Sequence, residues 1–137
     1  MTSPLLGLRA AILARCAADA ALSTLLGGAG RLYDEPPRGE PALYALFGPA
    51  ELSDWSTSSD RGHEQQLGIV VWSRPGNAAA ALAAADRIAT LLDDAPLAVA
   101  GHRLVSLAVL AQNADRDPDT GLGRVALRLR ATTEVAP

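Results

Sequence analysis

The segment 64–74 most constrains what this chain can fold into, because it contains the run Ile-Val-Val-Trp at positions 69–72. β-Branched and aromatic residues are enriched in strands, and a run of them without polar residues is typical of a strand buried on both faces. The run ends in Arg-Pro-Gly-Asn at positions 74–77, and an Ala-rich segment that favours a helix follows directly. A central strand that leads straight into a helix predicts layers in which helices pack against a sheet.

Composition and charge exclude several classes of function. The 137 residues suffice for one domain, which would bury roughly 70% of the surface of the unfolded chain. The net charge is −3, and the basic residues, all of them Arg, are scattered, which argues against a dedicated nucleic-acid surface. The 49% hydrophobic content argues against disorder. We therefore expect a single globular domain, residues 1–137.

The chain carries no pattern that indicates export, a membrane span or a disulfide framework. The single cysteine, Cys16, lies inside an apolar helical pattern, so neither a disulfide nor a cysteine-based metal site is expected. No charged start precedes a long apolar run, as a signal peptide would require. The longest apolar stretches are too short or too rich in Ala to span a bilayer. We expect a soluble protein of the cytoplasm.

The first third of the chain predicts two helical segments and an extended connection. Apolar residues recur at helical spacing from the start of the chain. Asp19 can cap a second helical segment, residues 20–26, and we expect the chain to bend there. A proline-rich connection, residues 31–41, then reads as extended rather than helical. Its early apolar residues, Leu32 and Tyr33, are expected to dock against the core.

Four strands and one long helix are expected in the remainder. Gly-Pro at positions 48–49 indicates a bulge or an edge position in the first strand, because Pro cannot donate to a ladder. The last strand alternates apolar residues with Arg, which marks one buried face and one wet, basic face. Joined by hairpins, the strands predict an α+β two-layer sandwich, with a mostly antiparallel four-stranded sheet and the helices on one face. The expected elements are a strand at 42–52, the central strand, a helix from Asn77 to about Leu92, a short strand at 97–100 that turns into another at 103–110, and a strand at 122–135.

The long helix is expected to pack with a face of mostly small residues. Asp86 and Arg87 are expected to point outward. The acidic pair Asp93 and Asp94 stands at the negative end of the helix dipole, an unfavourable position that the sequence does not explain. The expected apolar face consists of Ala81, Leu82, Ala85, Ile88, Ala89 and Leu92.

Patterns that could carry chemistry fail on spacing. The Asp-rich segment 115–121 resembles the start of a calcium loop, but Thr120 stands where the loop needs Gly, and Ala126 where it needs Glu. An Asp/Pro/Gly hairpin connection is the better interpretation. His63 and His102 both adjoin Gly in predicted turns, where solvated side chains are expected, and no further zinc ligand stands at a matching spacing. No nucleophile elbow or phosphate loop matches, so we predict no catalytic, cofactor or metal residues.

Two features leave a choice between a structural role and a contact with a partner. Arg124, Arg128 and Arg130 can keep the wet face of the last strand soluble by pairing with acidic neighbours, or can meet carboxylates of a neighbouring subunit, since Arg suits planar two-point contacts. The polar loop 54–63 is long for a hairpin turn. Its one large apolar side chain, Trp55, can fold back onto the sheet edge or contact a partner.

A combination of segments along almost the whole chain gives a family resemblance. These segments are the opening helix with Leu8 and Ile12, the helix end from Leu22 to Gly28, Arg-Leu-Tyr-Asp-Glu-Pro-Pro at 31–37, Leu-Gly-Ile-Val-Val-Trp-Ser at 67–73 with Gly76, and the Asp-rich turn before an Arg-alternating strand. In this combination the chain resembles the small tail-completion, or tail-terminator, proteins of long-tailed phages, in particular the version found in gene transfer agents.

The resemblance implies an α+β subunit that forms a six-membered ring, which caps the tail tube and joins it to the connector or stopper on the head side. Its partners would be further copies of itself, the tail tube protein and the connector. DNA would only pass through the lumen, and the acidic balance of the chain suits a duct that should not hold phosphate. No enzymatic activity, cofactor or membrane contact is implied. The protein would be cytoplasmic during assembly and then part of the particle.

Contacts with neighbours in such a particle are expected at the loop 54–63, at the turn 115–121 and along the Arg row. Two other hypotheses remain at this point. One is a small-molecule-binding domain or enzyme built as an α+β dimer, which would need a pocket with convergent polar groups. The other is a generic dimeric interaction module, which differs mainly in ring closure. The candidate interface residues are Asp54, Trp55, Asp60, Arg61, Arg116, Asp117, Arg124, Arg128 and Arg130.

Overall fold

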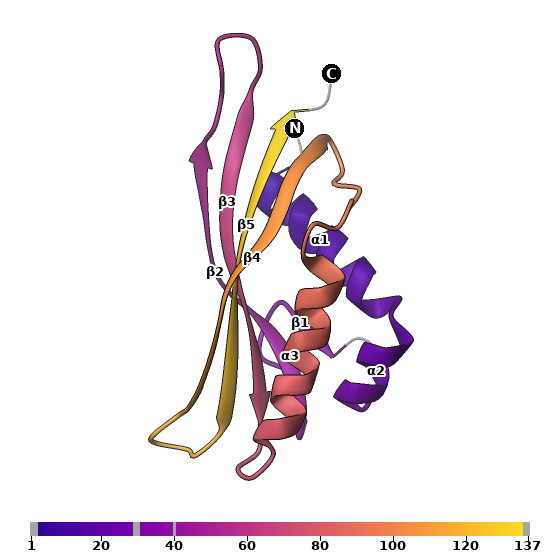
Figure 1. Cartoon of the computed structure of the whole chain (residues 1–137), viewed down its shortest axis with the longest axis vertical. Coiled ribbons are helices and arrows are strands. Elements are labelled where there is room, and N and C mark those ends of the chain that lie inside the picture. Colours follow the sequence, from indigo (N-terminus) through magenta and orange to yellow (C-terminus); the bar gives the residue numbers. More distant parts are fainter. Residues whose placement is uncertain (1–2, 29–30, 40, 136–137) are drawn as a thin grey trace.

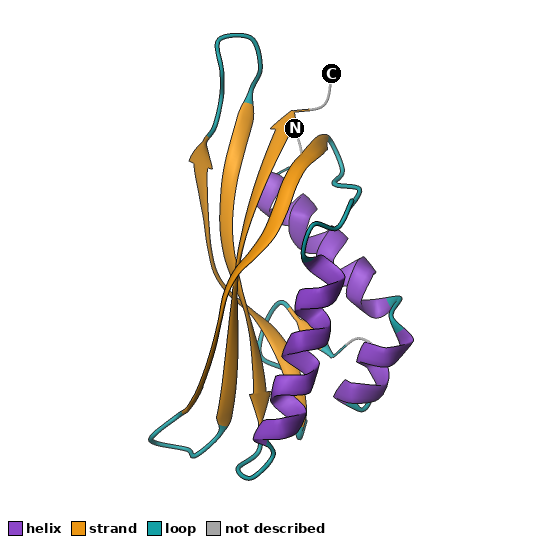
Figure 2. Cartoon of the chain, in the orientation of Figure 1, coloured by secondary structure: helices purple, strands orange, loops and turns teal. Residues whose placement is uncertain are grey.

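A five-stranded sheet carries the three described helices on one of its faces, and no described element covers its other face (Figures 1 and 2). The computed structural model describes residues 3–28, 31–39 and 41–135. The predicted α+β class is confirmed. The elements are α1 (Pro4–Ala17), α2 (Ala20–Leu26), β1 (Leu32–Tyr33), β2 (Leu43–Asp54), β3 (Gly62–Ser73), α3 (Ala78–Leu92), β4 (His102–Arg116) and β5 (Gly123–Val135).

The sheet is mixed and has the strand order β1-β2-β3-β5-β4. The prediction of a four-stranded sheet is wrong, because β1 adds a fifth strand that runs parallel to β2. Leu32 and Tyr33 lie beside Ala45 and Leu46, and the Ala45 N–H donates to the Arg31 carbonyl at 2.9 Å. Leu32 is buried, as predicted for this segment. A strand of two residues is too short to produce a periodic pattern, so only its docking could be predicted.

The other pairs of the sheet are antiparallel. The register of β2 against β3 shifts between Phe47 and Ala50, which confirms the bulge predicted at Gly-Pro. After β3 the chain crosses the helical face as α3 and reaches the edge position as β4. The final strand, β5, then returns between β4 and β3 (Figure 1). This crossover makes β3 and β5 neighbours, so the two most strongly patterned strands form the centre of the sheet.

β3 is central but is buried on one face only, so the prediction of burial on both faces is wrong for a single copy. Residues 65, 67, 69, 71 and 73 are buried against the helices, whereas their neighbours at 66, 68, 70 and 72 are half-buried or exposed. The apolar residues Val70 and Trp72 therefore lie on the open face of the sheet. β5 alternates in the same way, with Arg on its open face as predicted.

Residues 97–100 do not form the predicted strand. Only an isolated bridge joins Val99 to His102, where the His102 N–H donates to the Val99 carbonyl at 3.0 Å. Val99 instead packs on α1, since a Cβ added at Gly7 would lie 3.1 Å from its Cγ1 atom. The apolar run at 97–100 thus serves helix packing rather than the sheet. The following strand, predicted at 103–110, extends to Arg116.

α3 has the predicted length, and four of the six residues predicted for its buried face are buried, namely Ala81, Ala85, Ile88 and Leu92. Leu82, expected in the core, is 41% exposed, and Arg87, expected to point outward, reaches Asp19. An almost wholly apolar helix does not define its own buried side, so the packing of α1 and α2 beside it decides which residues face the core. Asn77 is the N-cap residue, although its side chain makes no capping hydrogen bond. The buried residues of α3 are Ala81, Ala84, Ala85, Ile88, Leu91 and Leu92.

The first helical region breaks where it was predicted to bend. Asp19 takes an extended conformation and its carboxylate accepts the N–H of Leu22 at 2.8 Å, which caps α2. Gly27, with φ of 79°, ends α2 in the left-handed conformation that favours glycine. The helices cover an apolar core whose largest fully buried residues include Leu8, Ile12, Leu22, Ile69, Ile88, Leu92, Leu127 and Leu129.

The acidic pair that follows α3 covers part of the outer edge of β4. The carboxylate of Asp93 accepts the N–H of Val109 at 2.9 Å, and the N–H of Asp94 donates to the carbonyl of Leu107 at 2.8 Å. Unpaired edge groups are a template for pairing with other chains, so these two bonds protect the edge. The pair has a structural explanation that the sequence did not supply.

Candidate interaction surface

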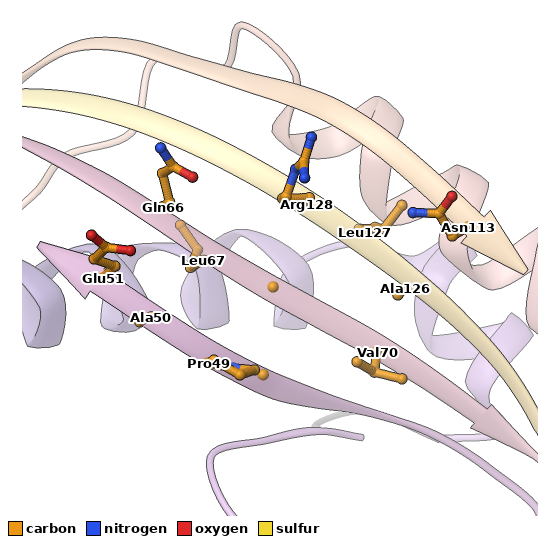
Figure 3. A pocket seen from close by; sticks show the side chains of 12 residues that line it. Pro49, Ala50, Glu51, Gln66, Leu67, Val70, Asn113, Ala126, Leu127 and Arg128 are labelled. Carbon is orange, nitrogen blue, oxygen red and sulfur yellow. The ribbon is translucent and has the colours of Figure 1, made fainter. Parts of the chain in front are cut away.

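A groove crosses the open face of the sheet, on the side away from the helices (Figure 3). Its volume is about 600 Å³. The floor is bare because three neighbouring strands place small residues there, namely Gly48, Gly68 and Ala126. A Cβ added at Gly48 would lie 3.6 Å from the backbone of Gly68, so the two glycines bring β2 and β3 together without side chains between them. The lining residues are Gly48, Pro49, Ala50, Glu51, Gln66, Leu67, Gly68, Val70, Asn113, Ala126, Leu127 and Arg128.

Charges of opposite sign stand at the two sides of this groove. Glu51 lies on β2 and Arg128 on β5, and neither has an ion-pair partner among the described residues (Figure 3). The rest of the lining is largely apolar, with amide groups from Gln66 and Asn113. A shallow apolar floor between polar sides is suited to holding a protruding apolar surface of a partner without covalent chemistry.

The Arg row of β5 divides into paired and unpaired residues. Arg124 forms a two-point pair with Asp115, with nitrogen–oxygen distances of 2.6 and 2.7 Å, and its guanidinium lies 5.6 Å from the ring centre of Trp72. Arg130 binds Glu64 at 2.8 Å. These hydrogen bonds hold the pKa values of both carboxyls below their ordinary range. Of the three predicted arginines, Arg128 is thus the one left available for another molecule.

The other predicted contact residues lie at opposite ends of the sheet. The loop between β2 and β3 projects beyond the helices, and the turn between β4 and β5 lies at the far end (Figure 1). The sheet therefore separates two groups of predicted contact residues rather than bringing them together. Asp54, Trp55, Asp60 and Arg61 belong to the first group, and Arg116 and Asp117 to the second.

Trp55 folds back onto the sheet and remains partly exposed. A Cβ added at Gly62 would lie 2.9 Å from its Cε3 atom, so the ring lies directly over the start of β3. Trp55 is still 37% exposed. The loop is closed by its own hydrogen bonds, including Ser56 Oγ to the Asp54 carboxylate at 2.6 Å, which lowers the pKa of that carboxyl. Of the two arrangements considered for Trp55, the structure thus shows the one in which the ring folds back onto the sheet.

The two histidines do not lie in solvated turns, so that prediction is wrong. His63 belongs to β3 and His102 to β4, and their ring centres lie 6.3 Å apart. His102 is only 8% exposed. β3 begins at Gly62 and β4 begins at His102 itself, so both histidines are strand residues and their rings lie in the sheet. Within the described ranges, no three His, Cys, Asp or Glu side chains are placed to hold a metal ion.

The groove itself was missed by the sequence reasoning. A glycine inside a strand pattern often marks a close backbone approach, and Gly48 and Gly68 occupy such positions in two adjoining strands. Their juxtaposition depends on the register of β2 against β3, which the sequence does not reveal.

In the part of the chain that is described, no helix is long and apolar enough to cross a membrane.

Comparisons with known proteins agree on one kind of relative. A comparison with curated proteins gave no significant match. Among solved structures, the chain is similar to a chain in the virion of a native gene transfer agent particle, with 30% sequence identity and a TM-score of 0.87. The match covers 98% of this chain and 99% of that one. The model of the tail completion protein gp17 family matches residues 10–134. The chain therefore belongs to the tail completion protein gp17 family.

Proposed function

We propose that this protein is a structural subunit of a phage-like particle and acts as its tail terminator. Copies form a ring, with six as the expected number, which caps the tail tube and joins it to the connector on the head side. The observation that carries the proposal is the similarity over nearly the whole chain to a chain of a gene transfer agent virion. Family membership supports a role in completing a tail, which requires no enzymatic activity.

The surface of the chain is compatible with DNA transit through such a ring. The net charge is −3, and two of the three arginines on the open face of β5 are paired with carboxylates of the same chain. A duct that bound phosphate strongly would hold the DNA in place. We therefore propose that DNA moves through the ring without being held there, and that the tail tube protein and the head connector bind to the ring. Assembly takes place in the cytoplasm.

Electron microscopy of particles from a producer strain that lacks this gene tests the proposed function. The expected result is a mixture of unattached heads and tails of uncontrolled length, which a plasmid copy of the gene corrects. Attached tails of normal length in the deletion strain would overturn the proposal. In that case, binding of metabolites to the purified protein becomes the next measurement, because the alternative is a small-molecule-binding domain.

A further inference from the structure

Two surfaces on opposite sides of the molecule are more apolar than exposed surfaces usually are. The first is the groove on the open face of the sheet. The strand beneath it, β3, has the continuous apolar run typical of strands covered on both faces. On the open face, however, Val70 lines the groove with no helix or strand over it in the described chain, and Trp72 is covered only by the side chain of Arg124. A strand with this pattern therefore lacks, in a single copy, a layer that covers its second face.

The second surface is the outward side of α3. The polar residues of this helix are Asp86, Arg87 and Thr90, and Arg87 is engaged by Asp19. A helix that is apolar all round is normally buried all round. The outward side is nevertheless exposed, with Leu82 at its centre. It lies on the far side of the two-layer sandwich from the groove (Figure 1).

We propose that these two surfaces bind each other between neighbouring copies, so that the outward side of α3 of one copy lies in the sheet groove of the next. This inference rests on the ring of the proposed function and identifies its subunit contact. It commits the groove to a second copy of this chain. Each sheet would then be covered on both faces, and each α3 would be buried on both sides, as the two sequence patterns require.

The shapes of the two surfaces suit close packing. The groove floor of Gly48, Gly68 and Ala126 lets the backbone of a partner helix approach closely. On α3, the exposed residues on either side of Leu82 are small, with Ala79 one turn before it. Leu82 is therefore a single projecting apolar side chain on an otherwise flat helix surface, and the bare floor offers it space.

The charges at the contact are complementary. Asp86 stands one helical turn after Leu82, and its carboxylate has no partner among the described residues. Arg128 stands at the side of the groove and is likewise unpaired within the described chain. With Leu82 on the groove floor, a carboxylate one turn away reaches the side of the groove. The contact thus joins Asp86 to Arg128 and leaves the other unpaired charge of the groove, Glu51, at the opposite side.

The placement of the surfaces explains why the contact would form a ring. A patch that binds a different patch of the next copy is heterologous, and heterologous contacts give closed rings or open filaments rather than two-fold dimers. Each copy here has one surface of each kind on opposite sides. Every copy can therefore bind two neighbours at once by the same contact.

Reciprocal charge reversal tests the contact in a producer strain. Asp86→Arg and Arg128→Asp alone should each lower the number of particles with attached heads and tails by about tenfold or more, because each places like charges opposite one another. The double variant should restore most of the loss. Both positions are exposed, and unchanged melting temperatures of the purified variants show that folding is intact. Arg38→Asp, at an exposed position away from both surfaces, is the matched control and should have no effect.

Cross-linking in assembled particles provides a second test that does not depend on charge. A variant with both Ala83→Cys and Ala126→Cys should give a ladder of linked copies with a short bismaleimide reagent, whereas either substitution alone should give none. The native Cys16 is buried and does not interfere. Links from Ala126→Cys alone to another virion protein would overturn the proposal, because the groove would then hold that protein.

The results separate the contact from the function on which it rests. The proposed contact is wrong if both charge variants produce normal particles and the double cysteine variant gives no cross-linked ladder. A termination defect in the deletion strain would still support the tail-terminator function in that case. If the deletion strain itself assembles normal particles, the function is wrong and the contact loses its basis. Loss in both single charge variants with rescue in the double variant supports the contact directly.

Discussion

Asp19, the N-cap residue of α2, and Arg87, on α3, form a two-point ion pair that joins the start of α2 to α3. The Nε and Nη2 atoms of Arg87 lie 2.9 and 2.7 Å from the two carboxylate oxygens of Asp19. The same carboxylate caps α2 through the N–H of Leu22. One side chain therefore fixes both the helix start and its position against the next helix, which explains why the chain breaks at this residue.

Replacement of Asp19 should make the stability of the protein less dependent on acid pH. The Arg87 hydrogen bonds and then the Leu22 N–H lower the pKa of Asp19 from 3.8 to about 2. The unfolded chain binds the proton more readily, so the stabilisation is present above about pH 4 and is lost as the pH falls toward 2. Asp19→Asn should melt at a lower temperature at pH 7, and the difference from the unchanged protein should shrink across this window.

The matched control for this pH dependence is Asp119→Asn, at an exposed position in the turn between β4 and β5. Its melting temperature should stay close to that of the unchanged protein at every pH. A deficit in Asp19→Asn that is equally large at pH 2.5 and pH 7 would show that the ionised carboxylate is not what stabilises the break between the helices.

Loss of the Asp93 side chain should expose the edge of β4. Asp93→Ala leaves the Val109 N–H without its acceptor, so hydrogen exchange at that amide should be about tenfold faster and heat-induced light scattering should start earlier. Asp94→Gly is the control. It keeps the backbone bond to Leu107 and places glycine at φ of 57°, so stability should be equal or slightly higher. Equal scattering by Asp93→Ala and the unchanged protein would contradict a role in edge protection.

The sequence predicted correctly those parts of the fold that depend on a residue and its near neighbours along the chain. The alternation of β5, the bulge at Gly-Pro and the Asp19 cap all follow from neighbours within a few residues. The parts that were missed depend on distant packing. The exposure of Leu82 and the contact of Arg87 with Asp19 depend on how α1 and α2 pack beside α3. Val99 and Ala100 lie against Gly7 of α1 instead of forming a strand.

In the candidate site, too, the features that depend on contacts between distant parts of the chain could not be predicted. Sequence identified Arg128 as outward-facing, but the pairing that separates it from Arg124 and Arg130 depends on cross-strand register. The groove requires Gly48 and Gly68 to meet across two strands, which no single-strand pattern reveals. The apolar run at 69–72 predicted a strand covered on both faces, whereas in a single copy Val70 and Trp72 lie on the open face of the sheet.

Gly62 and Gly68 should respond in opposite ways to the same substitution. A Cβ at Gly62 would lie 2.9 Å from Trp55 Cε3 and about as close to two backbone oxygens, so Gly62→Ala should cost about 1–3 kcal/mol in the free energy of unfolding. At Gly68 the nearest atom would be at 3.5 Å, an ordinary contact, so Gly68→Ala should preserve or slightly increase stability.

Denaturant unfolding measures both changes, and Trp55 fluorescence locates the first. In a Trp72→Phe background, Gly62→Ala should shift the emission of Trp55 toward that of a solvated indole, whereas Gly68→Ala should leave it unchanged. Equal stability of the two glycine variants, with unchanged emission, would mean that Trp55 does not lie over Gly62 in solution.

The thiol of Cys16 should be unreactive until the helical layer opens. Burial, and then the charge of Asp19, raises the pKa of Cys16 to about 11, so very little thiolate is present at pH 8. Ellman's reagent should therefore label the native protein only at the slow rate of local or global opening, and should label it at once in guanidinium chloride. Ala83→Cys provides an exposed thiol as the control, with one fast-reacting group per chain. Fast labelling of the unchanged protein under native conditions would mean that the α1–α2 corner opens readily, and the two-point pair between Asp19 and Arg87 would then not hold that corner closed.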